Sequence, residues 1–205
     1  MHKTAEQNAI RFFETYVSNE NETFLEIGSY LSSFNIRSLS SQTSKYIGVD
    51  LGSGPGVDIV LSDPYKLPFE DNSFDYVISS SCFEHSEFFW ELFLEIMRVL
   101  KPTGLFYLNA PSNGDFHRFP VDCWRFFPDS GNALSNWANR NGYNSAVVEQ
   151  YTSDKENDIW SDYVSIFIKD INNINLYPNR ILNSFNNYTN GTLYPHDTLL
   201  NKKLW

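Results

Sequence analysis

The stretch Thr23-Phe24-Leu25-Glu26-Ile27-Gly28 decides the fold, because this short apolar run ends at a carboxylate and a glycine. A second run of the same kind, Lys45-Tyr46-Ile47-Gly48-Val49-Asp50, ends at another carboxylate. Short and nearly continuous apolar runs are typical of strands that are covered on both faces of a parallel sheet. The Ser-rich segment 29–42 between them predicts a short, weak helix at most.

Further strands and helices are predicted from similar patterns. In the helices, apolar residues recur at spacings of three and four, most clearly in 87–100. Strands that alternate with helices favour an α/β fold with a largely parallel sheet covered on both faces. The additional strands are predicted at 57–61, 74–79, 105–110, 146–151 and 163–169, and the helices at 4–17, 87–100 and 129–141.

The length of 205 residues suits one domain with a full-sized core. We predict that this domain covers residues 1–170. The last 35 residues, 171–205, hold nine asparagines and show little periodicity. They are predicted to form a C-terminal extension, to which the sequence assigns no role.

Composition excludes several classes of protein. Lys and Arg number 15 against 25 Asp and Glu, and this net charge of -10 disfavours a dedicated nucleic-acid binder. Neither a membrane-spanning apolar run nor a secretory signal is predicted. The two cysteines, Cys82 and Cys123, provide neither a disulfide framework nor a zinc site, so no metal site is expected. We therefore expect a cytoplasmic protein that binds no nucleic acid, and we leave open whether it forms a homo-oligomer.

Carboxylates follow the predicted strands at Glu26, Asp50 and Asp63. Ligands of parallel α/β sheets bind outside the carboxyl ends of the strands, and an acid after the second strand can accept both hydroxyls of a ribose. Asp50 lies 22 residues after Gly28, close to the spacing expected for that role. For Asp50 alone, the alternative is a solvated residue that caps a strand end.

Five ordered motifs resemble those of class I S-adenosylmethionine-dependent methyltransferases, especially the small-molecule branch. The resemblance covers roughly residues 23–110. It implies a Rossmann-like, doubly wound and mostly parallel seven-stranded sheet, an enzyme, and S-adenosylmethionine as its cofactor. The motifs occupy residues 24–28, 46–50, 63–69, 73–79 and 98–104.

The resemblance also implies a set of cofactor contacts at the strand ends. Glu26 would steady the loop near the methionine ammonium, Asp50 would hold the ribose, and Asp63 would meet the adenine edge. The glycine-rich pattern of the family is not kept after Gly28, and the glycines at 52–56 favour a flexible turn over a relocated cofactor loop. The full implied set is Glu26, Ile27, Gly28, Ser29, Asp50, Leu51, Asp63, Pro64, Ser80 and Ser81.

An aromatic-rich segment, 110–128, follows the fifth strand and is predicted to be a substrate lid. His117 is the leading candidate for the catalytic base, since the unperturbed pKa of histidine is close to neutral, and His85 and Asp122 are the other candidates. The predicted substrate-binding residues are Arg118, Arg125 and Trp124, with the arginines attracting an anionic group. Alternatively, the segment is a hydrophobic cover in which the arginines pair with Asp115 and Asp122, and His85 is a hydrogen-bonding residue at a helix start.

Three functions remain open from the sequence. The leading one is methyl transfer to a hydroxyl of a sugar or phosphorylated intermediate in surface-polysaccharide biosynthesis, and the last detail follows only from the resemblance. The second is a non-catalytic binding or scaffold protein with the methyltransferase fold, which the missing glycines motivate. A nicotinamide-dependent reductase is disfavoured, because no Gly-x-Gly-x-x-Gly follows the first strand.

Overall fold

A computed structural model describes residues 2–18, 21–31, 33–155 and 159–203, which are organised around one nine-stranded sheet. The strand order is β3-β2-β1-β4-β5-β7-β6-β8-β9. The strands are β1 (Thr23–Ile27), β2 (Lys45–Asp50), β3 (Ile59–Val60), β4 (Phe74–Ser80), β5 (Leu100–Pro111), β6 (Ala146–Ser153), β7 (Asp162–Ile168), β8 (Tyr188–Leu193) and β9 (His196–Leu200).

The sheet has two parts with different pairing. Strands β3, β2, β1, β4 and β5 pair in parallel, as expected for buried apolar strands joined by crossovers. Strand β7 runs antiparallel between β5 and β6. The strand order reverses between β1 and β4, and in parallel α/β sheets such a reversal marks the edge where ligands bind.

The predicted number of seven strands is wrong, because β8 and β9 extend the sheet beyond β6. Both strands come from the segment 171–205, part of which lies outside the described residues. Strand β8 is rich in Thr, Asn and Gly, so it lacks the apolar pattern that identifies buried strands. Its place depends on backbone pairing with β6, which the hydropathy pattern does not reveal.

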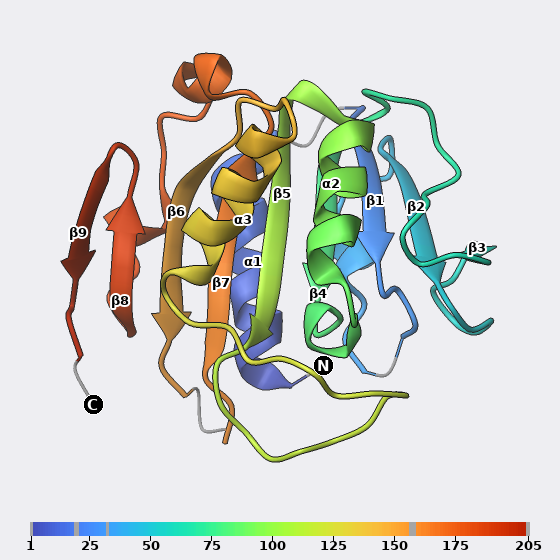
Figure 1. Cartoon of the computed structure of the whole chain (residues 1–205), viewed down its shortest axis with the longest axis horizontal. Helices are drawn as coiled ribbons and strands as arrows, with labels where there is room; N and C mark the ends of the chain where they lie inside the picture. Colours follow the sequence, from blue (N-terminus) through green and yellow to red (C-terminus); the bar gives the residue numbers. More distant parts are fainter. Residues whose placement is uncertain (1, 19–20, 32, 156–158, 204–205) are drawn as a thin grey trace.

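Helices cover both faces of the sheet, which confirms the doubly wound arrangement (Figure 1). Helix α1 (Lys3–Tyr16) lies on one face, and α2 (Phe89–Val99) and α3 (Ser130–Arg140) lie on the other. None of the helices described is long and apolar enough to cross a membrane. Short 3₁₀ turns complete the fold: η1 (Ile36–Leu39), where a weak helix was expected, η2 (Phe83–His85), η3 (Ile171–Leu176) and η4 (Ile181–Asn183).

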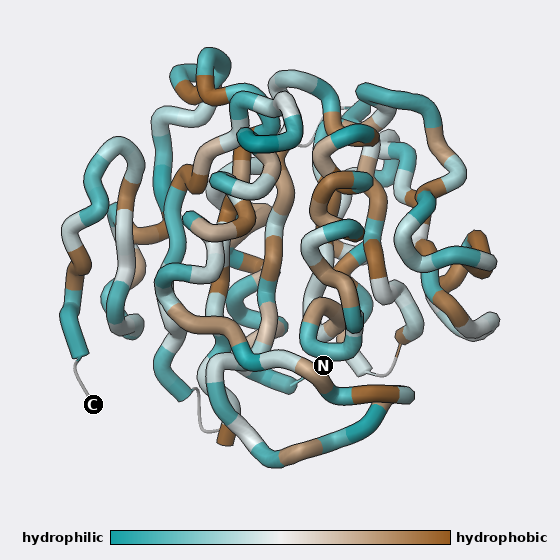
Figure 2. The backbone as a smooth tube through the Cα atoms, viewed as in Figure 1, coloured by the Kyte–Doolittle hydropathy of each residue, from teal (hydrophilic) through white to brown (hydrophobic). Residues whose placement is uncertain are grey.

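An aromatic core holds the helices against the sheet. The ring of Phe93 on α2 packs 5.9 Å from Phe106 and 4.9 Å from Phe167, centroid to centroid. On the opposite face, Phe12 of α1 packs 4.9 Å from Tyr107. Each fully buried large apolar side chain contributes about 1.5–3 kcal/mol to folding. Figure 2 shows the resulting pattern, with hydrophobic residues recurring along α2 and the strands behind it and hydrophilic ones on its outer turns.

The segment between β5 and α3, residues 112–129, crosses beneath the carboxyl ends of the parallel strands (Figure 1). Backbone hydrogen bonds fix it at both ends: Ser112 N–H donates to Ser161 O at 2.9 Å, and Phe126 N–H donates to Pro111 O at 3.0 Å. In the middle, Cys123 N–H donates to Glu84 O at 2.8 Å. The strand ends and this segment therefore enclose a common space.

Candidate active site

A cavity of about 980 Å³ lies at the carboxyl edge of the parallel strands. Its size is at the upper end of the range of about 300–1,000 Å³ for small-molecule sites. Its lining has two parts. The strand-end half is formed by residues 26–29, 50–52, 64–65 and 80–81, and the loop half by 84–85 and 117–121 together with His2 and Trp160.

The turn after β1 requires a glycine. Gly28 has φ +78, and a Cβ placed there would lie 2.6 Å from the Cβ of Cys82. The N–H groups of Gly28 and Ser29 both donate to Val49 O, at 3.0 and 3.1 Å. The turn therefore presents bare backbone to the cavity even though the family's later glycines are missing.

The glycine turn after β2 packs against the turn after β1. Leu31 N–H donates to Pro55 O at 2.8 Å, and a Cβ on Gly48 would lie 2.3 Å from Gly56 O. Gly52 and Gly56 both line the cavity. The glycines thus permit close backbone packing beside the cavity. Only a flexible turn was expected here from the sequence.

Glu26 places a carboxylate on the cavity wall. Its Oε2 accepts a hydrogen bond from the Tyr46 hydroxyl at 2.8 Å. Burial raises the pKa of Glu26 to about 7, and the Tyr46 hydrogen bond and the charge of Arg37 oppose that rise. A ligand cation would favour the ionised form of this carboxylate and gain a charge-assisted contact with it.

Asp50 lies at the end of β2 with both oxygens facing backbone donors. Oδ2 accepts from Tyr30 N–H at 3.1 Å, and Oδ1 accepts from Gly52 N–H at 3.2 Å. Each carboxylate oxygen has a second lone pair, so the fixed group can still accept two ligand hydroxyls. Leu51 beside it is 54% exposed and lines the cavity, where it can flank a flat ring.

The remaining residues of the implied cofactor set lie close together, with one exception. Asp63 is exposed, accepts from Tyr65 N–H at 2.8 Å and does not line the cavity. Its neighbour Pro64 does. The hydroxyls of Ser29 and Ser80 are buried on the cavity wall and have no hydrogen-bond partner within the described chain. Buried hydroxyls without partners are available to hydrogen-bond a ligand, so together with the glycine turn they indicate that the strand-end half is a ligand-binding site.

The loop half contains two histidines with similar hydrogen bonding. Nδ1 of His85 lies against Val121 O, and Nδ1 of His117 is 3.0 Å from Asp115 O. Because a carbonyl only accepts, each Nδ1 donates the hydrogen bond, which leaves each Nε2 for another partner. The ring centroids are 5.1 Å apart, and burial lowers the pKa of His85. The site therefore offers two imidazole rings whose Nδ1 atoms are already engaged.

Glu84 is the residue of this half that sequence analysis missed. Its side chain is buried, its Oε1 lies 3.7 Å from Nε2 of His85, and its Oε2 has no hydrogen-bond partner within the described chain. Burial raises the pKa of Glu84 to about 8. The available signal was an acid beside a histidine directly after a predicted strand, but its burial depends on the loop that covers it.

His2 and Trp160 were also missed. Nε2 of His2 lies 2.7 Å from Oδ2 of the buried Asp162, and the ring of Trp160 lies 5.7 Å from His2 and 5.2 Å from His117. No sequence signal could have found this group, because its members are about 160 residues apart along the chain.

Three of the predicted loop residues form hydrogen bonds with each other or with nearby backbone, and they do not line the cavity: Asp122, Trp124 and Arg125. Arg125 binds Asp122 through two hydrogen bonds of 2.6 and 2.9 Å, and this pair holds the pKa of Asp122 well below its usual range. Asp122 also accepts from His117 N–H at 2.7 Å, so it positions the loop and is a poor proton acceptor. Trp124 donates its Nε1–H to Ser86 O at 3.0 Å.

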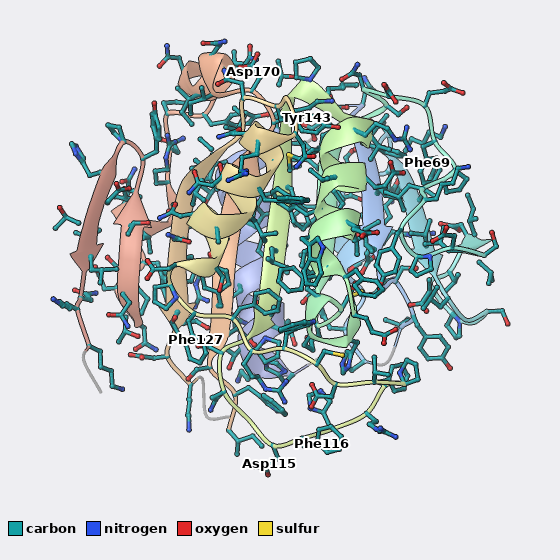
Figure 3. All side chains as sticks on the ribbon, viewed as in Figure 1. Phe69, Asp115, Phe116, Phe127, Tyr143 and Asp170 are labelled. Atoms are coloured by element: carbon teal, nitrogen blue, oxygen red, sulfur yellow. The ribbon has the colours of Figure 1, made fainter. Side chains whose placement is uncertain are left out.

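Arg118 is the charged residue of the predicted substrate set that lines the cavity. It lies 5.9 Å from the ring of Phe116 and forms no ion pair with the described residues. Figure 3 shows Asp115 and Phe116 directed away from the body of the fold, and Phe116 is 72% exposed. The loop thus has an exposed aromatic tip and an inner edge that carries His117 and Arg118.

Comparisons with known proteins agree with this geometry. A family model described as a methyltransferase domain matches residues 25–108, from β1 through most of β5. The phthiotriol/phenolphthiotriol dimycocerosates methyltransferase of Mycobacterium tuberculosis is 33% identical over 94 residues, 38% of this chain and 34% of that protein. Phosphoethanolamine N-methyltransferase 2 of Caenorhabditis elegans is 30% identical over 97 residues, 45% of this chain and 22% of that protein.

Solved structures show the same fold at low sequence identity. The 1,6-didemethyltoxoflavin N1-methyltransferase of Burkholderia thailandensis, with bound S-adenosylhomocysteine, has a TM-score of 0.64 at 14% identity, covering 82% of this chain and 79% of that one. A SAM-dependent methyltransferase of Methanosarcina mazei has a TM-score of 0.59 at 15% identity, covering 78% and 97%.

Residues 25–108 are therefore similar to a methyltransferase domain, and the fold is the Rossmann-like fold of the S-adenosylmethionine-dependent methyltransferases to which the structure is similar. The comparisons support the two expectations of an enzyme of this class and of S-adenosylmethionine as its cofactor. The chain spans about a third of the length of the mycobacterial relative. Neither the polysaccharide pathway nor a sugar acceptor finds support in the names of these proteins.

Proposed function

We propose that this chain is a cytoplasmic enzyme that transfers a methyl group from S-adenosylmethionine to a hydroxyl of a small molecule. The acceptor class we propose is a sugar or phosphorylated intermediate of surface-polysaccharide biosynthesis. The observation that carries the proposal is one cavity of about 980 Å³ that is lined by all of the implied cofactor residues except Asp63 and by two histidines, His85 and His117. We assign residues 1–170 to the methyltransferase domain and 171–205 to an extension.

The strand-end half has groups that match each part of the cofactor. Glu26 would face the ammonium group, the bare backbone at Gly28 and Ser29 would flank the methionine chain, and Asp50 would accept the ribose hydroxyls. Leu51 and Pro64 would enclose the adenine. When bound, the cofactor supplies an electrophilic methyl group, so the protein has to align the acceptor, exclude water and remove a proton.

The loop half has groups for the acceptor. Nε2 of His117 or of His85 would accept the proton, and Arg118 is placed to attract an anionic group. The phosphoethanolamine N-methyltransferase similarity adds a second phosphorylated acceptor to consider. Because an amine acceptor needs no strong base, the dependence of turnover on the histidines separates hydroxyl from amine acceptors.

The test is a turnover screen with S-adenosylmethionine and a panel of sugars, sugar phosphates and phosphoethanolamine, read as formation of S-adenosylhomocysteine. A signal with a sugar or phosphorylated hydroxyl, lost in His117→Ala or in His85→Ala, supports the proposal. Tight binding of S-adenosylhomocysteine without turnover of any acceptor would favour the non-catalytic binding protein instead.

A further inference from the structure

We propose that Glu84, His85 and His117 form a binding site for one divalent transition-metal ion, with Zn²⁺ as the expected occupant. No metal site was predicted from the sequence, and these residues lie in two segments that are about 30 residues apart. The site faces the loop half of the cavity. Its chemical role, argued below, rests on the proposed function, whereas the binding of the ion does not.

The distances permit one ion to reach all three side chains. One potential ligand atom from each residue lies within 4.8 Å of the other two, and Glu84 Oε1 is 3.7 Å from His85 Nε2. Two atoms bound to a zinc ion at about 2.1 Å are separated by about 3–4 Å, so the cluster has to contract slightly. The His117 side chain, which is 41% exposed, has the freedom to make that movement.

The hydrogen bonds of both rings prepare them as ligands. Each Nδ1–H is used by a backbone carbonyl, Val121 O for His85 and Asp115 O for His117. In metal sites, a histidine commonly donates its non-ligating N–H to a carbonyl or carboxylate, which fixes the tautomer and orients the ligating nitrogen. These hydrogen bonds thus leave Nε2 of each ring as the nitrogen that can bind an ion.

Glu84 supplies an independent observation that points to a cation. Its carboxyl group lies on the cavity wall, is buried with the residue 1% exposed, and has an Oε2 without a partner within the described chain. Arg125, the nearby guanidinium, is already bound by Asp122. A buried carboxylate without a partner is costly, and burial of such a group is usual where it coordinates a metal.

Two imidazoles and one carboxylate form a donor set found in catalytic zinc sites, which keep a position open for water or substrate. An acceptor hydroxyl bound at that position would have its pKa lowered by the ion. Its O–H bond would break, the electron pair would stay on the metal-bound oxygen, and the proton would pass to water at the cavity mouth. With the ion bound, the histidines act as ligands and no longer as proton acceptors.

Metal binding can be measured without an acceptor. The full chain, purified without a polyhistidine tag and stripped with a chelator, is titrated with Zn²⁺ by calorimetry and with Co²⁺ by visible absorption. We expect one Zn²⁺ per chain with a Kd below about 1 µM. Glu84→Gln and His117→Ala should each weaken binding at least about 100-fold. The matched control is His196→Ala, since His196 is exposed on β9 and should leave the affinity unchanged.

A Kd above about 100 µM for the unmodified chain, or equal loss in His196→Ala, overturns the site. Circular dichroism of the same samples tests folding, and binding of S-adenosylhomocysteine to them separates the two proposals. Zinc binding without cofactor binding leaves this site standing and contradicts the proposed function. Cofactor binding without zinc binding contradicts the metal site and leaves the proposed function standing.

Discussion

The two halves of the cavity are held in place by different forces. In the strand-end half, backbone hydrogen bonds fix the turns, as where Gly28 and Ser29 both donate to Val49 O. In the loop half, backbone hydrogen bonds such as that from Cys123 N–H to Glu84 O are joined by side-chain contacts, the Arg125–Asp122 ion pair and the hydrogen bond from Trp124 to Ser86 O. Backbone contacts tolerate many side-chain changes, whereas the loop depends on particular residues. The comparison suggests that the loop half sets acceptor choice and the strand-end half sets cofactor binding.

The sharpest separation of the halves comes from the histidines. His117→Ala should lower turnover by about 100- to 10,000-fold, the usual cost of removing a group that accepts or activates a proton. Affinity for S-adenosylhomocysteine should stay nearly intact, because the histidine lies in the loop half. Steady-state kinetics and calorimetry measure the two effects. If His85→Ala loses turnover and His117→Ala retains it, His85 is the residue needed for proton removal. If both variants remain active, neither histidine is needed for turnover.

A second test changes the backbone of the strand-end half at the glycine turn after β1. Gly28→Ala should destabilise the fold by about 3 kcal/mol or more, because a left-handed φ and a clash with Cys82 act together. Gly142→Ala is the matched control: Gly142 has φ +93 but open space around it, so only the conformational cost of about 1–2 kcal/mol is expected. Denaturant unfolding measures both. Equal losses would mean that the packing against Cys82 has no role.

Asp50→Ala tests the ribose contact. It should weaken S-adenosylhomocysteine binding by about 1.5–3 kcal/mol, the scale of lost hydrogen bonds to a charged group, or about 10- to 150-fold. Asp63→Ala is the comparison, since Asp63 is exposed and does not line the cavity, and its effect should be less than about threefold. Calorimetric titration decides. A larger loss of affinity in Asp63→Ala than in Asp50→Ala would indicate that Asp63 contacts the adenine edge.

The smallest expected effect is a pH dependence due to Glu26. Its pKa is raised to about 7, so its contribution to folding stability is full below pH 4.5 and is lost as the pH rises through 7. Binding of the cationic cofactor has the opposite sign, because it needs the carboxylate. Affinity for S-adenosylmethionine should therefore rise by up to about tenfold between pH 6 and 8. Glu26→Gln should remove that rise in affinity. If the affinity of this variant still rises with pH to the same extent, another group is responsible for the pH dependence.

How far the sequence predicts this molecule depends on the kind of contact. The ends of β1 and β2 were predictable, because Glu26 and Asp50 directly follow apolar runs that pair in the sheet. The edge strand β8 was not, because its position depends on backbone pairing with β6. Glu84 and His2 were not, because their burial depends on residues far along the chain, Cys123 and Asp162. Distant partners leave no local pattern.

Calorimetric titration of the intact chain with S-adenosylhomocysteine, and in parallel with NADH, tests the central claim most directly. The account predicts one site for S-adenosylhomocysteine with a micromolar or lower Kd and no measurable heat from NADH. Binding of NADH, or the absence of S-adenosylhomocysteine binding by a folded sample, would contradict it.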